Sequence, residues 1–131
     1  MSALSEVQVV ATTDVGTRCA LAEATRFTKE HHSARIVLLV PRVISAFTES
    51  SPDDDNRIAS TYRQIAASCG ADVVVRVCVC RTVAEVVSSM VSKRGLAVVG
   101  GTRRWWWPTP AQRLANALKK HGHRVVFADV G

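Results

Sequence analysis

The sequence predicts a single α/β domain in which five parallel strands form an open, doubly wound sheet with helices on both faces. Short apolar runs rich in β-branched residues alternate with segments of helical period along the whole chain. Alternation of this kind is typical of β-α units that build a parallel sheet. The length of 131 residues fits one domain, spanning 1–131, and leaves no linker for a second.

The expected strands are nearly continuous apolar runs, which favours parallel strands covered on both faces over half-exposed ones. They span residues 7–12, 35–40, 73–79, 96–100 and 124–130. Right-handed crossovers between them leave only a few doubly wound strand orders. The longest connection is expected over 42–51, after the second strand.

Four segments between the strands carry apolar residues at helical spacing. They span residues 16–31, 52–69, 83–93 and 110–121, and the inner face of the last one includes His121. Capping-box patterns, in which a threonine and a residue three positions on cap each other, begin two of them: Thr82 with Glu85, and Thr109 with Gln112. Three glycines follow helices where a left-handed residue is expected: Gly70, Gly95 and Gly122.

The net charge of +6 is unevenly distributed along the chain. Residues 1–75 hold 7 Lys and Arg against 9 Asp and Glu, whereas residues 76–131 hold 10 Lys and Arg against only Glu85 and Asp129. Such asymmetry indicates an anionic partner for the C-terminal half, or simply a solvated basic face.

The sequence shows no secretory signal and no apolar run of the roughly 18 residues that a membrane helix needs. We therefore expect a soluble cytoplasmic protein with no membrane partner. Its four cysteines lack zinc-site spacing and are expected to be reduced and buried: Cys19, Cys69, Cys78 and Cys80. No residues are predicted to bind a metal.

In an open parallel sheet, ligands bind outside the carboxyl ends of the strands, where the winding direction reverses. The loop after the first strand offers Thr12 and Asp14 near a helix N-terminus. The loop after the fourth strand offers amides and guanidiniums suited to phosphate. Its candidate residues are Gly100, Gly101, Thr102, Arg103 and Arg104.

With these loops and this element order, the whole chain resembles the universal stress proteins, part of the adenine nucleotide alpha-hydrolase-like group. The resemblance implies the strand order 3-2-1-4-5, a role in stress response, and a homodimer paired through the fifth strand. Nucleotide-binding members carry Gly-x2-Gly-x9-Gly-Ser/Thr after strand four. By this resemblance Asp14 and the end of strand two, Val40, would meet the base, and Gly101 matches the first glycine.

The rest of that phosphate motif is missing. Counting from Gly101, the second glycine position is Arg104 and the Gly-Ser/Thr pair falls on Leu114-Ala115. Counting from Gly100 instead places Arg103 and Arg113-Leu114 there. Glycine lets backbone amides approach phosphate without an intervening β-carbon, and these side chains do not. We therefore expect no cofactor and no tight ATP binding, while ATP or another adenine nucleotide stays open as a ligand.

Three consecutive tryptophans, Trp105, Trp106 and Trp107, follow the two arginines. Adjacent side chains diverge, so one interpretation packs one or two indoles over the end of the sheet. A second makes them an anchor for a protein partner or a second subunit. A third stacks them on a base, but one short aromatic–basic cluster is much less than a nucleic-acid module and argues against nucleic acid.

The sequence shows no nucleophile elbow, and no residue that could act as a general base lies beside Asp14 in the sequence. We therefore predict no catalytic residues and no enzyme activity. The leading hypothesis is a non-enzymatic, stress-associated binding or scaffold domain. The alternative is a domain that binds a nucleotide or another anion between the loops after strands one and four, using Asp14, Thr102, Arg103 and Arg104. Weak hydrolysis is the third.

Overall fold

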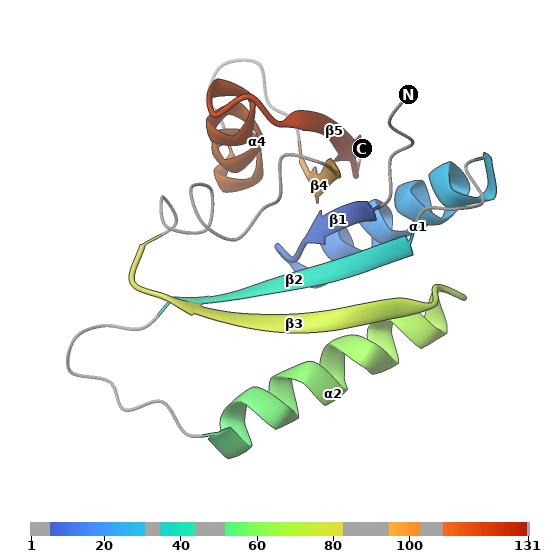
Figure 1. The fold of residues 1–131 in the computed structure, drawn as a ribbon, viewed down its shortest axis with the longest axis vertical. Coiled ribbons are helices and arrows are strands. Elements are labelled where there is room, and N and C mark those ends of the chain that lie inside the picture. The colour runs from blue at the N-terminus through green and yellow to red at the C-terminus, as the bar shows by residue number, and fades with distance from the viewer. Residues whose placement is uncertain (1–5, 31–34, 44–51, 83–94, 103–108, 131) are drawn as a thin grey trace.

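The computed structural model describes residues 6–30, 35–43, 52–82, 95–102 and 109–130 (Figure 1). Along the chain these form β1 (Glu6–Val10), α1 (Asp14–Glu30), β2 (Arg35–Val43), α2 (Pro52–Ser68), β3 (Val73–Cys80), β4 (Leu96–Gly101), α4 (Pro110–Lys120) and β5 (Arg124–Asp129). The predicted helix over 83–93, with the cap that involves Glu85, lies outside the described residues. Every other predicted element is present.

The five strands form one parallel sheet with the order β3-β2-β1-β4-β5, which confirms the predicted fold class and order (Figure 1). β1 lies at the centre, where Val9 pairs with Leu38 of β2 on one side and with Val98 of β4 on the other. The winding direction reverses between β1 and β4, so their carboxyl ends flank the place where such sheets bind ligands.

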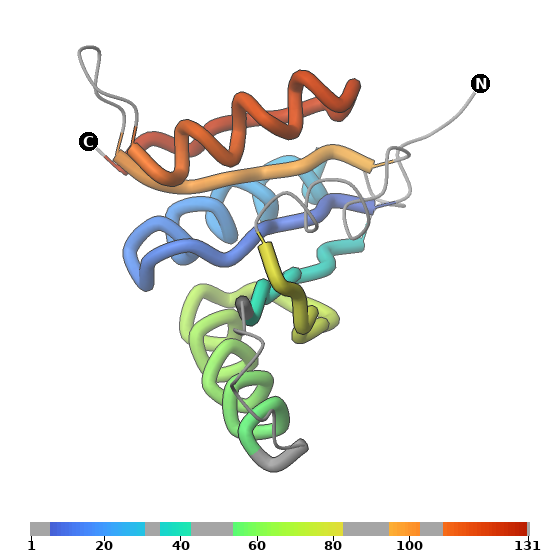
Figure 2. The backbone as a smooth tube through the Cα atoms, turned by 90° about the vertical axis from the view of Figure 1, so that its left-hand side faces the viewer, coloured from blue at the N-terminus to red at the C-terminus, as the bar shows by residue number. Residues whose placement is uncertain are grey.

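Two hydrophobic cores cover the two faces of the sheet. Val9 faces a core with α1 and α2, and its neighbour Val10 faces a second core with α4, because successive strand side chains point to opposite faces. Figure 2 shows α4 on one side of the strands, with α1 and α2 on the other. All four apolar or amide side chains from Val7 to Val10 are buried.

The apolar composition of the strands predicted that each would be buried on both faces. This is confirmed for β1 and β4, but it is wrong for β3 and β5. β3 alternates between half-buried and exposed positions, and Val74 keeps 44% of its surface exposed. The reason is position: β3 and β5 are the two edge strands, and the apolar composition of a strand does not reveal whether it lies at the edge.

Several predicted boundaries move by a few residues. β1 ends at Val10, so Thr12 belongs to the turn, and α1 begins at Asp14 instead of Gly16 because the Gly16 amide donates to Thr13 Oγ1 (3.0 Å) and extends the first turn. The predicted start of the connection at position 42 is wrong, because β2 continues beside β3 as far as Val43.

The helix ends confirm most of the capping predictions. Gly70 and Gly122 have positive φ angles of 71° and 87°, as expected after a helix. Gly95 is not among the positive-φ residues; close packing requires it instead, since a β-carbon there would lie 2.6 Å from the carbonyl oxygen of Glu6. At the start of α4, Thr109 and Gln112 form the predicted capping box.

Two further sequence predictions are corrected by burial. His121, expected on the inner face of α4, is exposed, and His123 is buried instead. Of the four cysteines, all free as expected, only Cys80 is fully buried. The other three are half-buried because they lie at the rim of the cores.

Candidate ligand-binding edge of the sheet

The polar residues predicted from the sequence converge at the carboxyl edge of the sheet. Val10 pairs with Leu39 and with Val99, so the turns that follow β1 and β4 leave the sheet side by side. Thr12 and Asp14 come from the first turn, and Gly100, Gly101 and Thr102 come from the second. The sheet register thus brings together residues almost ninety positions apart.

A hydrogen-bonded junction joins the two turns. Thr12 Oγ1 donates to the carbonyl oxygen of Gly100 at 2.7 Å, and the Thr12 amide donates to Thr17 Oγ1 at 3.0 Å. Thr17 is fully buried. Both hydroxyls have partners within the protein, so they hold the turn in place.

The first turn of α1 lies directly against β4 at Gly16 and Gly100. A β-carbon on Gly16 would lie 2.5 Å from the carbonyl oxygen of Gly100 and 2.5 Å from Thr12 Oγ1. A β-carbon on Gly100 would lie 2.8 Å from the carbonyl carbon of Gly16 and 3.2 Å from Ala20 Cβ. Real β-carbons essentially never approach within 3.0 Å, so both positions need glycine. The backbones of α1 and β4 are therefore in direct contact at this point.

Asp14 lies on the surface of α1 as its first residue, and its side chain is 62% exposed. Its Oδ1 accepts a hydrogen bond from Arg18 Nε at 2.6 Å, and this bond raises the pKa of the Arg18 guanidinium. Arg18 also donates to Ser68 Oγ at 2.7 Å. A carboxylate in the first turn interacts favourably with the positive end of the helix dipole and so stabilises the helix. Asp14 therefore has a structural role here besides any contact with a ligand.

The end of β4 packs against the start of α4. A β-carbon on Gly101 would overlap that of Ala111, so this glycine allows the helix to approach the strand. Thr109 Oγ1 donates to the carbonyl oxygen of Thr102 at 2.7 Å and accepts from the Gln112 amide at 3.3 Å. The Gln112 side chain accepts from the Thr109 amide at 2.9 Å. The backbone amides of Thr109 and Gln112 thus donate hydrogen bonds within the cap, where they could otherwise donate to a phosphate.

The end of β2 is fixed by an ion-pair cluster that the sequence analysis missed. Val40 is 4% exposed, so only its backbone faces the edge. Two residues on, Arg42 pairs with Asp54 (3.4 Å) and Asp55 in the first turn of α2, and Arg57 pairs with Asp54 at 2.9 Å. The adjacent acids at the start of α2 were the only sequence signal, and it did not reveal their partner.

The arginines and tryptophans of the loop after β4, Arg103 to Trp107, lie outside the described residues. The structure therefore does not place the two arginines that were predicted to bind an anion. Within the described ranges, no group of three His, Cys, Asp or Glu side chains could hold a metal ion. No helix of the described part is long and apolar enough to cross a membrane.

An open parallel sheet wound in both directions from β1 and β4 defines the doubly wound class of α/β domain. Within that class, the chain has the fold of the universal stress proteins. No protein-family model matches the sequence, and no curated protein matches it either.

Three solved structures illustrate this likeness. A universal stress protein in complex with cAMP shares 19% identity at a TM-score of 0.64, over 99% of this chain and 100% of that one. A family member from Burkholderia pseudomallei shares 17% at 0.63, over 97% of both chains. One from Arabidopsis thaliana with AMP bound shares 12% at 0.57, over 95% of this chain and 91% of that one. Because the sequence identities are this low, the comparisons show a shared fold and nothing more.

Proposed function

We propose that this protein is a cytoplasmic, non-enzymatic binding or scaffold domain of the universal stress protein type, associated with stress response and without tight ATP binding. The observation that carries this proposal is the contact between Gly16 and Gly100. This contact leaves no room for a ligand group between the first turn of α1 and the end of β4.

The hydrogen bonds at the same edge support the proposal. The Thr12 amide donates to Thr17 Oγ1, and Thr12 Oγ1 donates to the Gly100 carbonyl oxygen. The Gly16 amide donates to Thr13 Oγ1. Breaking these bonds to admit a nucleotide costs about 1–3 kcal/mol for each buried polar group that the ligand does not satisfy. Asp14 is paired with a guanidinium, not with a general base, which favours a binding role over hydrolysis.

The alternative is a nucleotide- or anion-binding domain, and the cAMP and AMP complexes among proteins of this fold favour it. In that case Thr102, Arg103 and Arg104 would hold the anion, and the base would approach the end of β2 at Val40. Such a ligand would lie above the closed junction, not inside it.

Isothermal titration calorimetry of the purified chain with ATP, AMP and cAMP separates the two. The proposal expects dissociation constants weaker than about 100 μM, equivalent to less than about 5.5 kcal/mol of binding. Micromolar affinity that is lost in Arg104→Ala would establish the alternative instead. Phosphate release from ATP that disappears in Asp14→Ala would contradict the non-enzymatic assignment.

We also propose a homodimer paired through β5. This edge strand of six residues carries Val125, Val126 and Phe127, all only half-buried, and pairing with its own copy would cover them. Sedimentation velocity at micromolar concentration tests it. A dimer with backbone amides of β5 protected from exchange supports it, and a monomer throughout rules it out.

A further inference from the structure

We infer that the free edge of β3 binds an extended acidic segment of a partner protein, which pairs with β3 as an additional strand of the sheet. In the described part of the chain β2 is the one strand hydrogen-bonded to β3. Along its eight residues, β3 therefore directs a row of backbone N–H and C=O groups away from the sheet. Extended peptides bind such edges through main-chain hydrogen bonds.

The β3 edge has few of the features by which proteins usually block edge strands, and its one charged side chain is Arg76. Its sequence, VVVRVCVC, contains no proline or lysine, and Val74 and Val79 are 44% and 39% exposed on opposite faces. The other edge strand, β5, is shorter and has Arg124 and Asp129 at its two ends. β3 is thus the longer and more apolar of the two edges.

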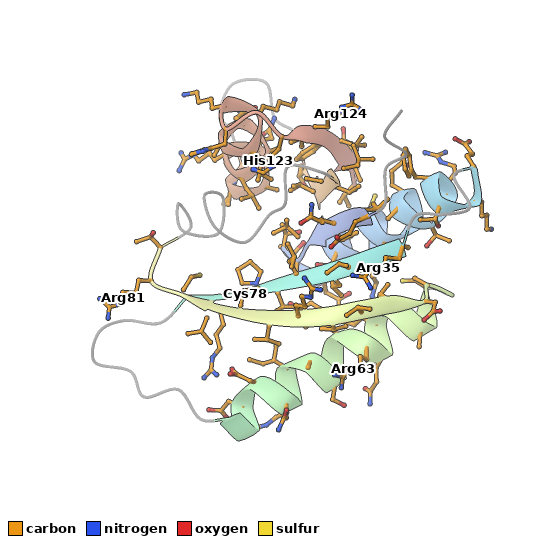
Figure 3. All side chains as sticks on the ribbon, in the orientation of Figure 1. Arg35, Arg63, Cys78, Arg81, His123 and Arg124 are labelled. Carbon is orange, nitrogen blue, oxygen red and sulfur yellow. The ribbon has the colours of Figure 1, made fainter. Side chains whose placement is uncertain are left out.

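Charge indicates which partner fits. Arg76, in the middle of β3, is exposed, and no ion pair joins it to another described residue. Figure 3 shows Cys78 and Arg81 along the outermost strand of the sheet, with Arg81 at the margin of the molecule. An acidic side chain directly across from Arg76 would form a favourable cross-strand pair.

A second copy of this chain fits the same edge poorly. Two copies paired through β3 would bring their exposed Arg76 side chains close together. Like charges in neighbouring strands are destabilising. The side chains of β3 instead match a segment that alternates acidic and apolar residues, with its acidic side chains on the face of Arg76 and its apolar side chains on the opposite face, which carries Val79.

The test uses the full chain and a fluorescein-labelled octapeptide that alternates valine and glutamate. Fluorescence anisotropy should show saturable binding that Arg76→Glu weakens at least about fivefold, because the variant replaces a cross-strand attraction by a repulsion. Arg113→Glu, an equal charge reversal at an exposed position on α4, should change the affinity less than about twofold. Circular dichroism checks that both variants keep the fold.

Two further measurements test the strand pairing itself. Hydrogen exchange should slow at the β3 amides on peptide binding while β5 stays unchanged. A peptide with the same side chains but alternate amides N-methylated should not bind, because it cannot form the main-chain ladder. Equal binding of the methylated peptide, equal weakening by the two charge reversals, protection at β5, or no binding at all would each overturn the inference. Self-association that protects β3 without peptide would assign the edge to a second copy.

Discussion

The contact between Gly16 and Gly100 gives the sharpest prediction about this structure. In Gly100→Ala the new β-carbon would lie 2.8 Å from the carbonyl carbon of Gly16 and closer still to its oxygen. Backbone cannot rotate away as a flexible side chain can, so either α1 or β4 must shift. Overpacking of this kind costs about 1–3 kcal/mol, and we expect the upper end because the bond from Thr12 Oγ1 to the Gly100 carbonyl is disturbed as well.

Urea denaturation should therefore show a loss of about 3 kcal/mol in the free energy of unfolding. With an unfolding entropy of about 2.1 cal/mol/K per residue, the melting temperature should fall by about 10 °C. The matched control is Gly70→Ala, where a β-carbon meets nothing within 4 Å and only the positive φ of 71° opposes the change. That strain costs about 1 kcal/mol.

A Gly100→Ala variant no less stable than Gly70→Ala would refute the reasoning. It would mean that the two turns are not in contact and that the edge of the sheet has room between them. The main support for the absence of tight nucleotide binding would then be lost.

Three further predictions concern other parts of the fold. Arg42→Ala should lower stability by about 1 kcal/mol, measured by urea denaturation, because it leaves two aspartates of α2 without their partly buried partner; no change would show that the cluster is incidental. Thr109→Ala should cost about 1 kcal/mol by removing the α4 cap, whereas Thr61→Ala, an exposed mid-helix change, should be nearly neutral, and equal losses would contradict the capping role. Burial raises the pKa of the Cys78 thiol above its ordinary value of 9.0, so alkylation by iodoacetamide should inflect at a higher pH than in the unfolded chain. The associated stability is present below pH 9.0 and is lost as the pH rises through the raised pKa, and an inflection at or below 9.0 would contradict this.

The type and approximate limits of most elements could be predicted because they depend on local signals, whereas the strand order came from the family resemblance. β-branched runs favour strands, and the capping box of Thr109 and Gln112 fixes the start of α4 whatever packs around it. The error at β2 had a physical cause, since Arg42 reads as a polar loop residue unless its partners at the start of α2 are known.

The candidate site could be predicted only as a set of residues. The residues expected at the carboxyl edge, including Thr12 and Gly100, do meet there, because the order of a parallel sheet determines which turns are neighbours. What they do there could not be predicted. The family resemblance implied that Asp14 would contact the base of a nucleotide. In the structure it pairs with Arg18 on the helix surface, and that pairing depends on where α1 begins.

The chain's own sequence determined the alternation of strands and helices, the glycines after α2 and α4, and the excess of basic residues in its second half. Those properties depend on side-chain chemistry and on neighbours within a few positions. Only the tertiary structure decided that Gly16 packs on Gly100, that Gly95 serves close packing, and that β3 is the outermost strand of the described sheet on its side. Contacts between distant segments depend on how strands are ordered and helices are seated, and local sequence does not encode them residue by residue.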